Sequence, residues 1–221
     1  MKSTLFLIVL LLCSGHLFAQ YSIKVKEEKE KIADGNHPCM VVSIYETNKN
    51  DVENAWEKLM KSYDAKVSSH KEIFADNALI KDISDNTVDV YARCEKESDN
   101  ELKFLVAVDM GGAFLNSSDH GSKEKAMEKI IKEFAKNQTL NGLENKIKDQ
   151  DKVYQKQQKE LEGLVKDKEK LEKDIENYKN KITDAENNIK QNLLDQTSKQ
   201  KEVETEKQKL DELTKLKSKV D

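Results

Sequence analysis

The chain has 221 residues, enough for one domain with an appendage or for two small domains. Charged residues make up 36% and hydrophobic residues 37%, an apolar share too low for one compact globule of this length. The net charge is −4 and no cationic block occurs, which argues against a nucleic-acid-binding protein, because phosphate contacts need a concentrated cationic face.

The N-terminus has the pattern of a secretory signal peptide. Lys2 supplies a positive charge, an apolar run extends from Leu5 to Leu12, and Ala19 is a small residue at the expected cleavage point. The apolar run is too short to span a membrane, and no other stretch of the sequence is apolar enough to do so. We therefore expect residues 1–19 to be removed and the mature protein to be exported, to the periplasm or the cell exterior.

Residues 20–37 are expected to be a flexible N-terminal segment, and a head domain is expected over residues 38–140. Within the head, Asn50 can cap a helix, and Glu53 stands three residues later, where a capping box places an acidic residue. The following apolar residues recur with helical spacing on one face. They are Val52, Ala55, Trp56, Leu59, Met60 and Tyr63. This stripe indicates a helix that packs on a core.

Four segments of the head have strand patterns. They are residues 39–45, a looser segment at 72–80 that Asp76 and Asn77 interrupt, the alternating segment 87–94, and the more apolar segment 102–108, which is expected to be central. A second helix is predicted from a cap near Ser122, with one apolar face. That face comprises Ala126, Met127, Ile130, Ile131 and Phe134. The order predicts an α+β head of about four mainly antiparallel strands, with both helices on one face of the sheet.

Two cysteines remain after cleavage of the signal peptide, Cys39 and Cys94. In an oxidising compartment such a pair suggests a disulfide. If the first and third predicted strands pair antiparallel, the start of one faces the end of the other, and the two thiols come close together. The alternative is a pair of buried small apolar side chains that are not bonded to each other.

The turn after the last predicted strand contains Asp109, Gly111 and Gly112, and it is either a structural turn or a binding loop. The remaining histidines share no metal-ligand spacing, and no Cys-x-x-Cys occurs. No acid–base pair stands out in so charged a chain. We therefore expect a protein that is not an enzyme and that uses no cofactor or metal.

Residues 141–221 predict a long coiled-coil helix, with Gly142 as the joint to the head. The segment has 19 lysines and 19 acidic residues, no proline, and an apolar heptad pattern that continues without a stutter. The seam residues are Ile147, Tyr154, Leu161, Leu164, Leu171, Ile175, Tyr178, Ile182, Ile189, Val203, Leu210 and Leu213. Ile at the first seam position with Leu at the second favours a parallel dimer. Between Asn192 and Glu206 the seam is polar, which leaves open a flexible joint, a loosely paired stretch or the bend of a helical hairpin.

The leader, together with residues 81–88 and the string Asp109-Met110-Gly111-Gly112-Ala113, resembles a group of uncharacterised exported bacterial proteins with a small α/β head and a coiled-coil tail. In outline, the leader, the β-containing body and the charged helical arm are also similar to Skp-type periplasmic chaperones. This second resemblance implies a protein that holds unfolded clients between its helices.

The sequence therefore favours a non-catalytic exported protein that acts as a structural, adaptor or binding module. The coiled coil is expected to mediate self-association, and an envelope protein is the expected partner of the head. A holdase-like chaperone is the first alternative, and a small enzyme in the head is the second. No nucleic-acid contact and no membrane span of the mature chain are expected.

Overall fold

The computed structural model describes residues 21–219. The chain divides into two units, residues 1–151 and residues 152–221, and each is considered by itself below. The predicted signal peptide, residues 1–19, lies outside the described residues.

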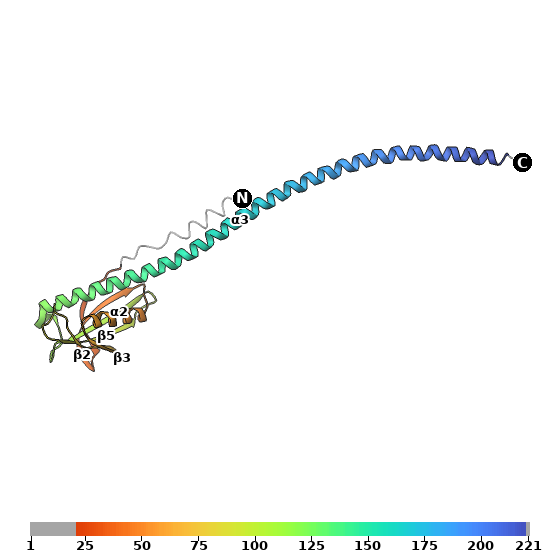
Figure 1. Ribbon diagram of the computed structural model, residues 1–221. Coiled ribbons are helices and arrows are strands. Elements are labelled where there is room, and N and C mark those ends of the chain that lie inside the picture. Colours follow the sequence, from red (N-terminus) through yellow and green to blue (C-terminus); the bar gives the residue numbers. More distant parts are fainter. Residues whose placement is uncertain (1–20, 220–221) are drawn as a thin grey trace. The chain divides into compact units, whose positions relative to one another are not determined.

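A six-stranded antiparallel sheet forms the centre of the first unit (Figure 1). Its strands, in sequence order, are β1 (Lys26–Ile32), β2 (Gly35–Tyr45), β3 (Lys66–Ser69), β4 (Ile73–Ala78), β5 (Val88–Lys96) and β6 (Glu101–Asp109). In space the order is β1-β2-β6-β5-β4-β3. The antiparallel sheet is confirmed, and so is the interior position of β6, but the sheet has six strands and not four.

The two additional strands lie at the edges of the sheet. The segment 20–37 was predicted to be flexible, which is wrong, because β1 pairs with β2 along its length. β1 has the sequence Lys-Glu-Glu-Lys-Glu-Lys-Ile, and only Ile32 at its end is buried. Charged residues at an edge discourage pairing with other chains, and they also remove the apolar alternation that identifies a strand. β3 has four residues and none of them is buried.

Two helices accompany the sheet, and both begin earlier than predicted. α2 (Lys49–Ser62) is capped by Asn48, whose side-chain oxygen accepts a hydrogen bond of 2.9 Å from the Asp51 amide. The predicted cap at Asn50 is wrong by two residues, because two asparagines close together can both serve as caps. α3 (Ser117–Lys217) has a kink at His120, and the predicted start near Ser122 lies inside it.

The main core lies between one face of the sheet and the two helices. α2 contributes Val52, Trp56 and Met60, and the first part of α3 contributes a second buried row. The members of that row are Met127, Ile131, Phe134 and Ala135. Trp56 packs edge-on against Phe104 of β6 and Phe134 of α3, with ring centroids 5.0 and 4.9 Å away. One aromatic cluster thus joins α2, the sheet and α3.

A smaller apolar cluster occupies the opposite face of the sheet. It contains Ile32, Cys39, Val41, Leu105 and Ala107. Arg93 of β5 donates a hydrogen bond of 2.7 Å to the Lys31 carbonyl, and the Ala33 amide donates one of 3.0 Å to Glu72, which precedes β4. Two strands separate β1 from β5 in the sheet order, so these bonds require the sheet to curl and bring the β1–β2 hairpin over the smaller cluster.

Gly142 is buried inside α3 and does not interrupt the helix. A Cβ atom at this position would lie 2.3 Å from the Glu46 carbonyl oxygen, in the loop between β2 and α2. The predicted joint between two helices is therefore wrong, and the absence of a side chain instead permits close contact between helix and loop. Thr139, one turn earlier, accepts a hydrogen bond of 3.1 Å from the Tyr45 amide.

The close contact at Gly142 predicts a large effect of a single methyl group. Gly142→Ala should destabilise the first unit by about 1–3 kcal/mol, because the backbone of Glu46 must move away from the new side chain. Denaturant unfolding followed by Trp56 fluorescence measures this change. Gly163→Ala is the matched control, because nothing lies within 4 Å of its new Cβ atom. An equal midpoint for both variants would contradict the packing described.

Candidate interaction surfaces

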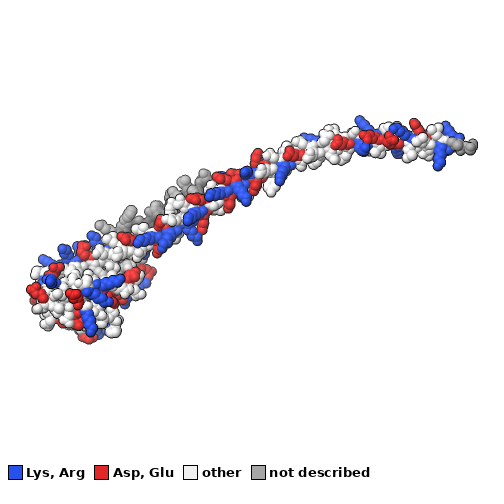
Figure 2. All heavy atoms as spheres, in the orientation of Figure 1, with Lys and Arg blue, Asp and Glu red and all other residues white. Residues whose placement is uncertain are grey.

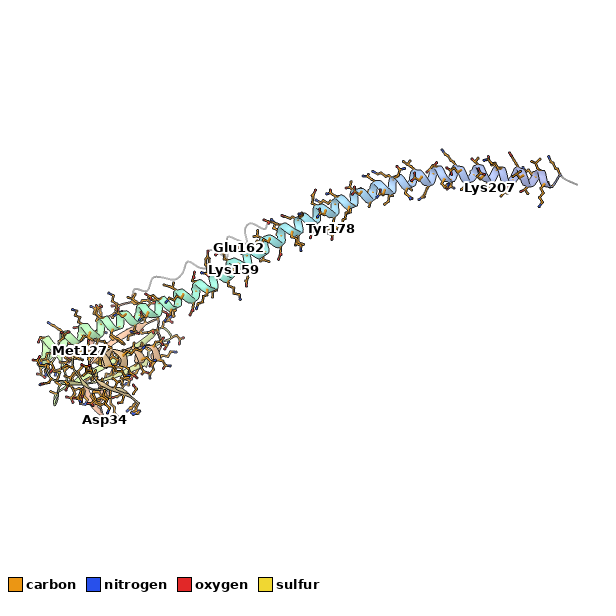
Figure 3. All side chains as sticks on the ribbon, in the orientation of Figure 1. Asp34, Met127, Lys159, Glu162, Tyr178 and Lys207 are labelled. Atoms are coloured by element: carbon orange, nitrogen blue, oxygen red, sulfur yellow. The ribbon has the colours of Figure 1, made fainter. Side chains whose placement is uncertain are left out.

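The second unit presents an apolar stripe on α3, and the same stripe begins at Ile147 in the last part of the first unit. The twelve predicted seam residues all lie on this helix, and each of them exposes between 54% and 67% of its surface. Figure 3 shows the side chains of this part of α3, Tyr178 among them, projecting from the helix. Within the described chain nothing buries the stripe, so it is available to another molecule.

Charges of both signs surround this stripe. On the visible face of residues 152–217, basic and acidic side chains alternate without a block of either sign (Figure 2). Several form ion pairs along the helix, such as Lys168–Glu172 at 3.3 Å and Lys209–Glu206 at 2.7 Å. Such pairs stabilise an isolated helix by only about 0.2–0.5 kcal/mol each, so they support the helix without replacing a partner.

The polar stretch of the seam does not bend the helix. α3 continues through residues 192–206, and Gln196 donates a hydrogen bond of 2.6 Å to the Asn192 side chain one turn earlier. The hairpin bend that the sequence left open is therefore absent. Two polar side chains of the seam, Asn192 and Gln196, therefore form a hydrogen bond with each other along the helix.

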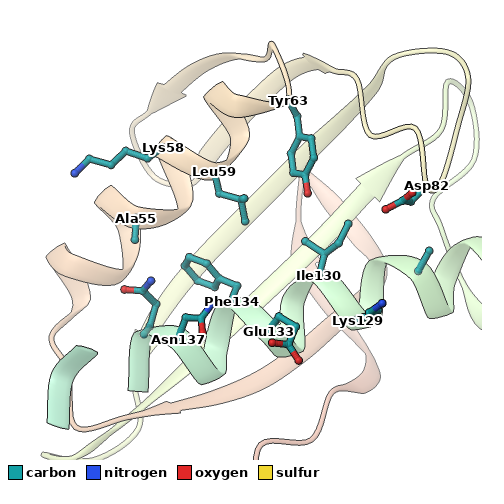
Figure 4. A pocket seen from close by; sticks show the side chains of 12 residues that line it. Ala55, Lys58, Leu59, Tyr63, Asp82, Lys129, Ile130, Glu133, Phe134 and Asn137 are labelled. Carbon is teal, nitrogen blue, oxygen red and sulfur yellow. The ribbon is translucent and has the colours of Figure 1, made fainter. Parts of the chain in front are cut away.

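The first unit presents a groove of about 830 Å³ between α2 and α3 (Figure 4). Its apolar walls are two rows with four-residue spacing, one on each helix. They are Ala55 and Leu59 of α2 with Tyr63, which caps the end of that helix, and Ala126, Ile130 and Phe134 of α3. Rows with this spacing are the ridges by which helices pack on one another. Their spacing predicts core residues, but the apolar arc of each helix is wider than contact with a sheet requires, and these side chains line the groove instead.

Polar residues form the rim of the groove: Lys58, Asp82, Lys129, Glu133, Asn137 and Gln138. Burial, followed by the nearby Asp82 carboxylate, raises the pKa of the Tyr63 hydroxyl, which therefore stays protonated near neutral pH. No serine, cysteine or histidine lines the groove. The arrangement can hold apolar side chains, with hydrogen bonds and charges at its edge.

The Glu46 carboxylate, in the loop between β2 and α2, links the segment before β1 to α3. Glu46 accepts a hydrogen bond from the Tyr21 hydroxyl and forms an ion pair with Lys146 of α3. Tyr21 also stacks on Tyr45, with ring centroids 4.7 Å apart. The Lys146 ammonium and then the Tyr21 hydroxyl hold the pKa of Glu46 below its usual value. Glu46 and Lys146 lie 100 positions apart, and no local pattern reveals this contact.

In the glycine turn after β6, the backbone amides of the two glycines bind a carboxylate of the same turn. Asp109 accepts hydrogen bonds of 2.9 and 3.0 Å from the amides of Gly111 and Gly112, and both glycines have positive φ angles. The amides that an anion would need are thus occupied by the chain's own carboxylate. The geometry favours the structural turn over the binding loop.

The sequence left open a disulfide or two unbonded thiols, and the structure has the second arrangement: both cysteines are free, and they are buried on opposite faces of the sheet. The disulfide required the strands of Cys39 and Cys94 to be neighbours. They are β2 and β5, and β6 lies between them. Burial raises the pKa of the Cys39 thiol to about 11 and that of the Cys94 thiol to about 12. Both behave as small apolar side chains.

Several features are absent from residues 21–219. No helix in this range is both long enough and apolar enough to cross a membrane. No group of three or more histidine, cysteine or acidic side chains in this range could hold a metal ion. No protein family, curated protein or solved structure matches the chain.

The two thiols should be unreactive in the folded protein. At pH 8 the thiolate fraction is very small for a pKa of about 11 or 12, and burial blocks access of a reagent. Ellman's reagent should detect almost no thiol in native protein, and both thiols after unfolding without reductant. Absence of free thiol in the unfolded protein would show that the cysteines are bonded to each other.

The Glu46 contacts should make stability depend on pH. The folded pKa of Glu46 lies below the ordinary value of 4.5, so its contribution is fully present above about pH 4.5 and is lost as the pH falls through the folded pKa. Denaturant unfolding from pH 3 to 7 should show wild type more stable than Glu46→Gln near neutrality, with the difference shrinking in acid. A difference that does not change with pH would exclude a role for the Glu46 charge.

Proposed function

We propose that the protein is a non-catalytic exported protein that self-associates through a parallel coiled coil of α3 and binds a partner in the cell envelope through its head. The observation that carries this proposal is the exposed apolar stripe of α3 at regular heptad spacing. Export rests on the signal-peptide pattern of residues 1–19.

The size of the stripe supports self-association. Burial of one large aliphatic or aromatic side chain contributes about 1.5–3 kcal/mol, and a coiled coil buries the stripe of both chains. Association costs about 4–15 kcal/mol in lost translational and rotational freedom. The free energy from burial of twelve exposed seam residues in each chain exceeds this cost, although the seam is polar between Asn192 and Glu206. A second copy of the chain is the partner that is certain to carry a matching stripe.

The order of residue types supports a parallel orientation. Ile175, Ile182 and Ile189 stand at the first seam position of three successive heptads, whereas Leu164 and Leu171 stand at the second seam position. Branched residues at the first position with leucine at the second favour parallel dimers. In that arrangement Asp174 faces Lys179 of the other chain, and Lys181 faces Glu186, which are attractive pairs.

A holdase-like chaperone is the second candidate, and the apolar groove between α2 and α3 is the observation that favours it. Such a groove accepts apolar side chains of an unfolded client. Suppression of aggregation of a denatured test protein measures this activity. If Leu59→Glu in the groove abolishes suppression whereas Glu57→Gln on the same helix retains it, the chaperone becomes the leading function. Without suppression by the wild type, this candidate is excluded.

Self-association predicts different effects of two apolar residues on the same helix. Ile182→Lys places a charge in the seam and should raise the dimer dissociation constant by roughly 100-fold or more, since apolar burial is lost in both chains. Leu194→Lys is the matched control, because Leu194 is 66% exposed and lies outside the seam. Analytical ultracentrifugation of mature chains over a concentration series measures both constants. Equal effects, or a monomeric wild type, would contradict the coiled-coil dimer.

A further inference from the structure

A row of aromatic rings crosses the face of the sheet that the two helices leave uncovered. Phe74 of β4 stacks on Tyr91 of β5, with ring centroids 4.8 Å apart. Phe114, which follows β6, lies 6.4 Å from Tyr91 and stacks on His37 of β2 at 3.7 Å. All four rings are half-buried, so each keeps part of its surface in contact with solvent.

Carboxylates flank this row on one side. Asp89 of β5 and Asp109 of β6 stand directly opposite each other, and Asp76 extends the line into β4, one residue beyond the Ala75–Val90 pair. We call Phe74, Tyr91, Phe114, Asp76, Asp89 and Asp109 together the aromatic–acidic surface. Like charges directly opposite each other on a sheet are unfavourable, so a cation bound here would be stabilising.

Among residues 21–219, the hydrogen-bond donors to these carboxylates are all neutral. Asp76, Asp89 and Asp109 accept hydrogen bonds from Asn77, Gly111 and Gly112, which are neutral donors, and form no ion pair among residues 21–219. Lys66 stands opposite Asp76 in β3, is exposed and forms no ion pair with it.

The electrostatic environment of Tyr91 agrees with this description. Burial raises the pKa of the Tyr91 hydroxyl, and the carboxylates of Asp89 and Asp109 raise it further, with smaller effects of Asp34 and Glu72. No basic group is among the causes of this shift in the pKa of Tyr91. Arg93, two residues along β5, is held by Glu72 at 3.3 Å and by Glu95 at 2.6 Å.

The shape and charge of the surface select among ligands. Among residues 21–219, no group of three or more histidine, cysteine or acidic side chains could hold a metal ion, so the surface does not have the ligand set of a metal site. Phosphate-rich ligands such as nucleic acids and anionic lipids would be repelled. A guanidinium group is planar, stacks on aromatic rings and binds carboxylates in a bidentate manner, and therefore matches both halves of the surface. A separate cavity against Phe74 and Tyr91 has both basic and acidic lining residues, Lys31, Lys71, Asp34 and Glu72. Asp89 and Asp109 do not line that cavity, so they form the purely acidic side of Tyr91.

We propose that the aromatic–acidic surface is the docking site for an arginine-containing segment of a partner protein. In this arrangement a guanidinium group stacks on Tyr91 or Phe114 and donates hydrogen bonds to Asp89 and Asp109. Charge provides attraction over a distance, and stacking distinguishes arginine from lysine. The site lies in the first unit and does not depend on the coiled-coil proposal.

The test uses the full mature chain and a fluorescently labelled peptide that alternates Arg and Ser, with binding measured by anisotropy. Asp89→Asn with Asp109→Asn should weaken binding at least about tenfold, because two charge-assisted hydrogen bonds are lost. Asparagine at position 109 keeps an oxygen acceptor for the glycine amides. Asp85→Asn with Asp99→Asn is the matched control, because it removes the same charge from exposed positions outside the surface.

Three further measurements complete the test. A Lys-Ser peptide of the same length should bind more weakly than the Arg-Ser peptide to wild type, and Tyr91→Leu should reduce this preference. A Glu-Ser peptide of the same length should not bind, because the carboxylates of the surface repel it. The proposal is overturned if the Arg-Ser peptide fails to bind at millimolar concentration, if both double variants bind it equally, or if lysine and arginine peptides bind alike.

Discussion

The packing of the first part of α3 into the head core is the contact on which the rest of the structure depends. Met127, Ile131 and Phe134 close a core that the sheet and α2 leave open on one side. The first turn of a helix is unfavourable to form, whereas each later residue adds one hydrogen bond, so burial of these turns in the core stabilises the whole of α3. The same helix continues through residues 152–217, where its apolar stripe is uncovered.

Elements with a strong apolar period could be predicted from the sequence. The alternation of Val88, Val90 and Ala92 identified β5, and the apolar run at 102–108 identified β6 as an interior strand. The long C-terminal helix followed from the heptad pattern and the absence of proline. In each case burial of one face imposes a spacing that the residues must obey, so the pattern is visible without knowledge of the neighbours.

Features that depend on distant neighbours could not be predicted. β1 is an edge strand whose Glu30 pairs with Lys103 in place of apolar contact, and it therefore lacks alternation. The insertion of β6 between β2 and β5 separates the two cysteines, and no local signal reports strand order. The groove on α2 and α3 was hidden for a different reason, since Leu59 and Ile130 have the same spacing as core residues.

The proposed coiled coil is parallel and in register, and cysteine cross-linking tests this arrangement most directly. Leu161→Cys and Leu210→Cys, made in separate mature chains, both place a thiol at the first seam position. In a parallel register each new cysteine faces its own copy, so both variants should form disulfide-linked dimers on mild oxidation, visible on a non-reducing gel. An antiparallel pair would bring at most one of these positions together. Cross-linking of only one variant, or of neither, would contradict the account.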